Sequence, residues 1–223
     1  TGALTAAAAA TSDIPILGTS ITAYGVALDI DDFNGTVGGN ISGTSDLADL
    51  EAQANMITEW FPDATKVGLL FCSAEPNSRY QIGEVARCLS DKGIETKEFA
   101  FTDTNDVASV TQSAADYSDV VYVPTDNTAA SNTEAIANVV IPEKVPVVAG
   151  EEGICKGCGV ATLSISYYDL GVTTGKMAAK ILTGEADISE MPIEFTEATP
   201  KYNASMCETL GIEPLEGYTA IEE

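Results

Sequence analysis

The stretch KVGLLFC, residues 66–72, runs directly into the polar stretch SAEPNS, residues 73–78, and this junction decides the fold. The first part is a short, almost continuous apolar run, which is typical of a buried β-strand. Apolar residues then recur with helical spacing over 82–89, so an amphipathic helix follows the polar turn. A buried strand that leads through a polar turn into a helix is the repeating unit of α/β proteins with a parallel sheet.

The same pattern recurs along the rest of the chain. Further strands are predicted from the apolar runs at 14–17, 95–101, 119–123, 145–149 and 160–165. Helical spacing predicts a helix from Ser45 or Asp46 to Phe61 and another from Ser166 to Ile181. Ser78 with Gln81, and Ser131 with Glu134, are spaced as helix capping boxes. The sequence therefore predicts an α/β protein with a mostly parallel sheet.

Composition bounds the size and excludes several functions. The chain has 223 residues, 34 acidic against 10 basic, no His and a formal charge of −24. This length suits one large domain or two modest lobes, and no apolar run approaches the ~18 residues that span a bilayer. The acidic balance excludes nucleic acid and anionic membranes as natural partners. The absence of His excludes Ser-His-Asp and Cys-His catalysis.

The cysteines and glycines leave some chemistry open. The five Cys include Cys155 and Cys158 in CxxC spacing, which suits structural thiols, a local disulfide, or a metal or redox pair. Gly residues punctuate a polar loop over 35–43, where turns with positive φ are expected. Neither GxGxxG after a strand nor GxxxxGK[ST] occurs, so no nucleotide cofactor is expected. We expect no other cofactor and no metal.

Polar residues gather directly after the predicted strands. In open α/β sheets, ligands bind beyond the carboxyl ends of the strands, where helix N-termini supply free N–H groups. Each of these residues alone also fits a helix cap or a turn. We take the following as candidate ligand-binding residues: Thr19, Ser20, Thr22, Ser73, Glu75, Asn77, Ser78, Thr125, Asp126, Asn127, Glu151, Tyr168 and Asp169.

The residue types in this set suit a zwitterion such as an amino acid. Asp126, directly after a buried strand, is a natural partner for an ammonium group. Hydroxyls and helix N-terminal amides at Asn77 and Ser78 are natural partners for a carboxylate. Tyr167, Tyr168 or Tyr122 could supply an aromatic wall.

An ordered series of motifs carries a family resemblance. These motifs are NISGTSD at 40–46, KVGLL at 66–70, SAEPNS at 73–78, YVPTDN at 122–127 and ISYYDLG at 165–171. With them the chain resembles the ABC-transporter substrate-binding proteins of the aromatic amino-acid (tryptophan) binding family, which have a type I periplasmic-binding fold. The likeness extends over essentially the whole chain and includes the stretch TGKMAAKIL at 174–182.

The resemblance implies two Rossmann-like lobes joined by a hinge. Lobe one is expected to comprise 1–63 and 167–195, and lobe two 64–166 and 196–223. Relatives begin with further βα units, so the first lobe is expected to be incomplete, either in a fragment or in a natural short form. Such a lobe would expose apolar surface and favour self-association.

The resemblance also implies a function. The chain would be the extracytoplasmic solute-binding component of an ABC importer, periplasmic or anchored as a cell-surface lipoprotein. Thr19, Ser20 and Thr22 would face the residues of lobe two across a cleft that closes on an apolar or aromatic amino acid. The closed form would engage a membrane permease.

Two other functions remain open at this point. One is a ligand-sensing module on the same fold, and the other is an enzyme that pairs Asp126 with Glu151 or Glu152 as acid and base. If Asp126 binds a ligand ammonium, Asp126→Asn should cost about 2–5 kcal/mol of binding free energy. A loss under tenfold would instead make Asp126 a helix cap.

Overall fold

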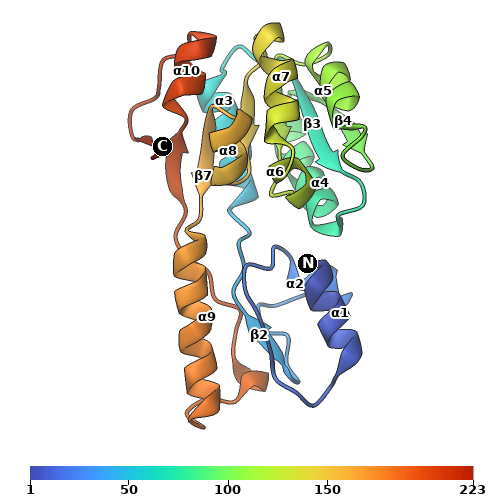
Figure 1. Cartoon of the computed structure of the whole chain (residues 1–223), viewed down its shortest axis with the longest axis vertical. Coiled ribbons are helices and arrows are strands. Elements are labelled where there is room, and N and C mark those ends of the chain that lie inside the picture. Colours follow the sequence, from blue (N-terminus) through green and yellow to red (C-terminus); the bar gives the residue numbers. More distant parts are fainter. Residues whose placement is uncertain (223) are drawn as a thin grey trace. The chain divides into compact units, whose positions relative to one another are not determined.

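The computed structural model describes residues 1–222, and the chain divides into two compact units (Figure 1). Unit 1 comprises Thr1–Leu47 and Ile165–Glu197, and unit 2 comprises Ala48–Ser164 and the chain from Ala198 onward. The first boundary therefore follows Leu47, whereas the sequence predicted it after residue 63. The reason is that helix α3 (Leu50–Trp60) packs against α4 and β7 of unit 2 and buries Ala54 and Ile57 completely.

Unit 2 is built around a seven-stranded sheet in the order β4-β3-β5-β6-β7-β8-β9. The strands are β3 (Lys66–Cys72), β4 (Glu95–Phe101), β5 (Val120–Val123), β6 (Val147–Ala149), β7 (Ala161–Ser164), β8 (Thr199–Tyr202) and β9 (Thr219–Ala220). Neighbours pair in parallel except β7 and β8, which are antiparallel. This bears out a mostly parallel sheet.

Helices cover both faces of this sheet. Helix α3 packs with α4 on one face, and α5, α7 and α8 pack in series on the other (Figure 1). The remaining helices of the unit are α4 (Pro76–Asp91), α5 (Val107–Ala115), α6 (Asn127–Ala130), α7 (Thr133–Glu143), α8 (Glu152–Cys158) and α10 (Ala204–Leu210). Side chains that alternate along the strands, such as Leu70, Phe101 and Val121, form a buried core with the second group of helices.

The strand order places a topological switch point between β3 and β5. The chain crosses from β3 outward to β4 and then returns past β3 to β5, so the two neighbouring connections leave in opposite directions. A crevice opens at the carboxyl ends of such a pair of strands, and ligands of doubly wound folds bind there. The turns after β3 and β5 are the two stretches at 73–78 and 124–127 that the sequence singled out.

Unit 1 contains a two-stranded parallel sheet of β1 (Ile16–Gly18) and β2 (Ile41–Gly43). Its helices are α1 (Gly2–Ala10), α2 (Tyr24–Leu28), α9 (Tyr167–Leu182) and the 3-10 turn Ile188–Glu190. Leu4, Ile21, Tyr24, Ala27, Ile41 and Ile193 form its buried core. Gly43 has a φ of 143°, and a Cβ there would lie 2.0 Å from the Gly18 carbonyl oxygen. The two strands thus approach as closely as they do because Gly stands at this position.

Several predicted element boundaries were wrong. The helix expected from Ser45 or Asp46 begins at Leu50, because Asp49 caps it by accepting from Ala52 N. Neither predicted capping box forms, since Ser78 lies inside α4 and Asn132 stands at the start of α7. Ser166 does cap α9, as predicted, by accepting from Asp169 N.

Candidate functional site

The turn after β3 is fastened to the turn after β5 through Glu75. One oxygen of the Glu75 carboxylate accepts from Asn127 N at 3.1 Å and from Asn127 Nδ2 at 2.9 Å. The other oxygen accepts from Thr128 N at 2.9 Å and from Thr128 Oγ1 at 2.8 Å. Burial alone would raise the pKa of Glu75, but these four hydrogen bonds outweigh it and lower the pKa. Glu75 is therefore an ionised carboxylate at the amino end of α6.

Buried amides make a second link between the same turns. Asn77 Nδ2 donates to the Thr125 carbonyl at 3.1 Å, and Gln81 Nε2 donates to the same oxygen at 3.0 Å. Gln81 Oε1 accepts from Thr125 N at 3.0 Å. Thr125 Oγ1 extends the network by donating to the Gly150 carbonyl at 3.3 Å. The turns at 73–78 and 124–127 thus form a preformed rim at the carboxyl edge of the sheet, because their buried polar groups hydrogen-bond to one another.

Asp126 occupies the centre of this rim, but its contacts are those of a structural cap. It is 1% exposed, Oδ1 accepts from Ala129 N at 2.8 Å, and Oδ2 accepts from Cys72 N at 2.7 Å. Burial raises its pKa, and the negative charge of Glu75 adds to this, although hydrogen bonds from the two amides and from Ser78 oppose it. Asp126 thus joins the end of β3 to the start of α6.

The other two carboxylates after the strands are also engaged. Glu151 caps α8, accepting from Gly153 N at 2.8 Å and from Ile154 N. Glu152 forms an ion pair with Lys201 at 2.7 Å and accepts a hydrogen bond from Ser164. These partners account for both side chains, so the geometry gives no support to an acid–base pair with Asp126.

The amino end of α4 differs from the others at this rim. Among the helices that follow β3, β5 and β6, the N-cap side chains of α6 and α8 accept from their own helix, whereas Glu75 at the start of α4 does not. The first turn of α4 carries no acidic residue, and it contains the buried Asn77 and Ser78. The carboxylate of its N-cap residue, Glu75, is directed to Asn127 and Thr128, so no side chain of α4 caps the first turn of the helix.

The remaining predicted residues of unit 2 lie beside this rim. Ser73 Oγ donates to the Phe101 carbonyl at 3.2 Å, and Asn127 is exposed except for its contacts with Glu75. Tyr122 is not available as an aromatic wall, because it is fully buried in β5 and donates to Gln53.

In unit 1, the predicted hydroxyls follow β1 at the carboxyl edge of the smaller sheet. Thr19 is exposed, Ser20 is half-buried with a φ of 57°, and Thr22 is 5% exposed. Ser20 N donates to Thr44 Oγ1 at 3.2 Å, which ties the turn after β1 to the end of β2. The structure therefore brings these hydroxyls to the edge that the sequence predicted.

Asp46 is a buried carboxylate at the same edge that sequence reasoning placed at a helix start. It lies just after β2, is 7% exposed, and accepts from Tyr167 OH at 3.2 Å through Oδ2. Its other oxygen, Oδ1, is buried without a hydrogen-bond partner. Burial raises the pKa of Asp46, although hydrogen bonds from Thr22 and Tyr167 oppose the shift. Because β2 carries no strand pattern in the sequence, the position of Asp46 after a strand could not be read from it.

The aromatic and acidic candidates on α9 are exposed. Tyr168 is 80% exposed, and Asp169 is exposed in the first turn of the helix, where its backbone N–H donates to Ser166 Oγ at 3.2 Å. Tyr167 is 43% exposed and points its hydroxyl at Asp46.

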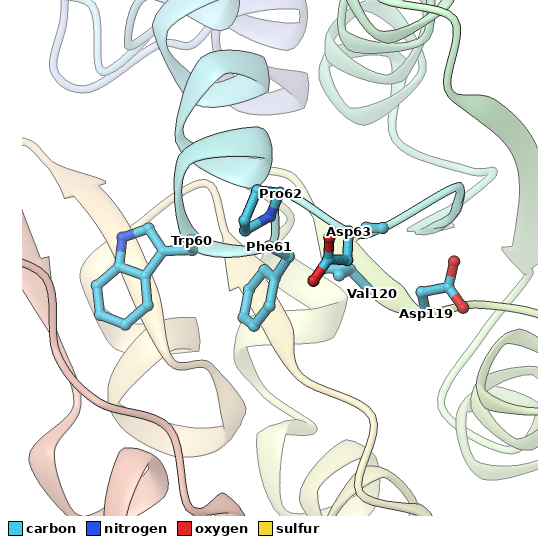
Figure 2. Close-up of a pocket in the computed structure, with 7 residues that line it drawn as sticks. Trp60, Phe61, Pro62, Asp63, Asp119 and Val120 are labelled. Atoms are coloured by element: carbon cyan, nitrogen blue, oxygen red, sulfur yellow. The ribbon is translucent and has the colours of Figure 1, made fainter.

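A pocket of about 380 Å³ lies at the opposite end of the larger sheet, where no site was predicted. It is formed by the loop after α3 and the start of β5, and Figure 2 shows its lining, which is Trp60, Phe61, Pro62, Asp63, Ala64, Asp119 and Val120. Asp119 Oδ2 accepts from Thr65 N at 2.8 Å and Lys66 N at 2.9 Å, so this carboxylate holds the two strand starts together.

The cysteines are buried thiols. Within residues 1–222, all five are free, and no group of three or more metal-binding side chains comes together. Burial raises the pKa of Cys158 to about 12, so this thiol stays protonated and unreactive at neutral pH.

Comparison with known proteins identifies the family. The sequence model of the ABC transporter substrate binding protein family matches residues 1–216. The chain belongs to this family. Its fold is accordingly the type I periplasmic-binding fold with two α/β units, and the family is one of binding proteins rather than enzymes.

The chain is similar to three bacterial binding proteins or domains. A tyrosine-binding protein of Clostridioides difficile is 29% identical over 193 residues, which are 85% of this chain and 54% of the relative. The chain thus spans about half the length of this curated relative. An ABC domain from Streptococcus pneumonia in complex with L-Trp is 29% identical, with a TM-score of 0.89 over 98% of this chain and 76% of that one. A ligand-free, open substrate binding protein with adhesive properties from Clostridium difficile is 32% identical, with a TM-score of 0.75 over 98% and 74%.

No helix within residues 1–222 combines the length and the apolar character needed to cross a membrane.

Proposed function

We propose that this chain forms the ligand-binding part of an extracytoplasmic solute receptor for an ABC importer, and that its ligand is an aromatic amino acid. The observation that carries the proposal is the amino end of α4 at the switch point of the larger sheet. The N-cap side chain there makes no cap hydrogen bond and the first turn carries no acidic residue, so this helix terminus presents N–H groups that its own side chains do not cap. These groups fit a carboxylate, the feature that all amino acids share.

The surrounding contacts support binding rather than catalysis. Glu75, Asp126 and Gln81 are used to hold the turns around α4 in place. A rim that is rigid before the ligand arrives loses little conformational entropy on binding, which favours affinity. The carboxylates that an acid–base mechanism would need are the same ones that cap helices or form the ion pair with Lys201.

The aromatic class of the ligand is supported by the relatives. One of them is a tyrosine-binding protein and another was solved with L-Trp, each 29% identical to this chain. Delivery to a membrane permease, and a periplasmic or lipid-anchored location, follow as parts of the same proposal.

Calorimetric titration of the full-length protein tests this. L-Trp, L-Tyr and L-Phe are compared with L-Leu, L-Glu and D-Trp, and with tryptamine, which is L-Trp without its carboxylate. We expect one aromatic amino acid to bind at one site, and tryptamine to bind roughly 10–100-fold more weakly than L-Trp if L-Trp is that ligand, since charge-assisted hydrogen bonds are lost. Equal affinity for L-Trp and tryptamine would overturn the role of α4, and no binding of any amino acid would overturn the function.

A further inference from the structure

The carboxylate of Asp46 has one buried oxygen that accepts no hydrogen bond. Its side chain is more than nine-tenths buried, and Oδ1 has no hydrogen-bond partner. A buried carboxylate oxygen without a donor is destabilising by an amount comparable to a lost hydrogen bond. In native proteins such a group is explained by strain, by a functional role, or by a donor that a water, an ion or a ligand supplies.

The rest of the carboxylate is held firmly. Oδ2 accepts from Tyr167 OH at 3.2 Å, and the Thr22 side chain acts to lower the pKa of the same carboxylate. Ser45, the preceding residue, is fixed by donating to the Thr22 carbonyl at 3.1 Å. Asp46 is therefore oriented by the turn after β1 and by the first turn of α9, with one oxygen left over.

Among the described residues of unit 1, no side-chain cation is bonded to this oxygen. Residues 1–65 contain no Lys or Arg, and the basic residues of unit 1 are Lys176 and Lys180 on exposed positions of α9. Lys176 lies nine positions beyond Tyr167, about 13 Å along the helix.

Asp126, the carboxylate that the sequence favoured for an ammonium group, lacks this property. Both of its oxygens accept backbone N–H groups, from Cys72 and Ala129, at 2.7 and 2.8 Å. A ligand ammonium would have to compete with these two bonds. At Asp46 it would fill an empty acceptor position.

We propose that Asp46 is the residue that binds the ammonium group of the ligand, with Thr22 and Tyr167 as positioning residues. Its location supports this, because Asp46 and Thr22 follow the carboxyl ends of β2 and β1, the edge at which parallel sheets bind ligands. The inference rests on the proposed amino-acid ligand and names the residue that recognises its ammonium group.

The test is calorimetry on the full-length protein and its Asp46→Asn variant, with L-Trp and indole-3-propionate, the analogue that lacks only the ammonium group. L-Tyr and its des-amino analogue replace them if the protein prefers L-Tyr. We expect Asp46→Asn to weaken binding of the amino acid roughly 10–100-fold and to leave binding of the analogue within about twofold. Asp126→Asn serves as the matched variant and should weaken both ligands equally or neither.

Tyr167→Phe keeps the test decisive if Asp46→Asn does not fold. Tyr167 is 43% exposed, so its hydroxyl can be removed with little effect on the core. We expect it to weaken binding of the amino acid several-fold and to spare the analogue. Equal loss for both ligands, or no loss in either variant, would overturn the role of Asp46 while leaving the proposed function intact. Failure of the unaltered protein to bind any amino acid would overturn both.

Discussion

Asp119 shows what a single exposed carboxylate does for this fold. Its Oδ2 accepts from Thr65 N, Lys66 N and Thr65 Oγ1, and these hydrogen bonds tie the start of β3 to the start of β5. Backbone hydrogen bonds from Thr65 and Lys66 lower the pKa of Asp119. The ionised form is therefore the one that stabilises the folded state.

We expect Asp119→Asn to lower the free energy of unfolding by about 1 kcal/mol at neutral pH, a value kept small because the side chain is exposed to water. Since the folded-state pKa is lowered, this stabilisation is present above the unfolded-state value of about 3.9 and is lost as the pH falls through the folded-state pKa. Urea unfolding of the two proteins from pH 7 to pH 2 measures it. The exposed Glu98→Gln serves as the control, and a difference that grows on acidification would contradict the assignment.

Asp126→Asn separates a structural role from a ligand-binding one. An Asn side chain presents an NH2 group to one of the two backbone N–H donors, so we expect a loss of about 1–3 kcal/mol in unfolding free energy. Because Asp126 contacts the protein through both oxygens, we expect the affinity for the amino acid to change by less than tenfold. Chemical unfolding and calorimetry on the same preparation measure the two quantities, and the reverse pattern would restore Asp126 as the ammonium partner.

The sequence located the rim at residue level but not the partner of each residue. The turns at 73–78 and 124–127 were predicted as a polar cluster, and the structure joins them through Glu75, Asn77 and Thr125. Which carboxylate has a free oxygen depends on backbone N–H groups distant in sequence, such as Cys72 N for Asp126. For the same reason Asp46 was missed, since its burial depends on α9, more than a hundred residues away.

At the scale of elements, β1 and β2 depend on one glycine. Gly43 and Gly35 both have positive φ, but a Cβ at 43 would meet the Gly18 carbonyl oxygen at 2.0 Å, whereas nothing lies within 4 Å of one at 35. We expect Gly35→Ala to cost about 1–2 kcal/mol through backbone strain alone, and Gly43→Ala to cost more because the strands must separate. Hydrogen exchange of the β1 and β2 amides measures this, and equal effects of both substitutions would contradict it.

Asn203 makes a similar link in the larger unit. Its Oδ1 caps α10 by accepting from Met206 N at 3.1 Å, and its Nδ2 donates to the Cys155 and Lys156 carbonyls at 3.0 and 2.9 Å. We expect Asn203→Ala to lower the unfolding free energy by about 2–3 kcal/mol, since a cap and two buried acceptors lose their partner. Glu208→Gln, at an exposed position of the same helix, should cost under about 0.5 kcal/mol. Thermal unfolding compares them, and similar melting temperatures would show that the link is weak.

Elements with a continuous apolar run could be predicted closely, and the others could not. The strands at 66–72 and 95–101 have the predicted bounds, because burial or strong alternation marks them in the sequence. Strand β2 lies within a Gly-rich stretch and β8 contains Pro200, so neither carries a strand pattern. Their strand character comes from tertiary pairing, with β1 and β7 respectively.

At the scale of the whole molecule, charge dominates. A formal charge of −24 implies self-repulsion that weakens the folded state at low ionic strength. We expect the melting temperature to rise by several degrees between about 10 mM and 500 mM NaCl, as the Debye length falls from about 30 Å to below 10 Å. Scanning calorimetry in matched buffers measures this. A melting temperature that falls with salt would show that attractive ion pairs outweigh the repulsion.

The central claim is that an amino acid's carboxylate binds at the amino end of α4. A crystal structure of the full-length protein with the bound aromatic amino acid tests it most directly. We predict carboxylate oxygens within about 3 Å of donors at Asn77 or Ser78. A ligand seated in the pocket beside Phe61 and Asp63, with the α4 terminus unoccupied, would contradict the account.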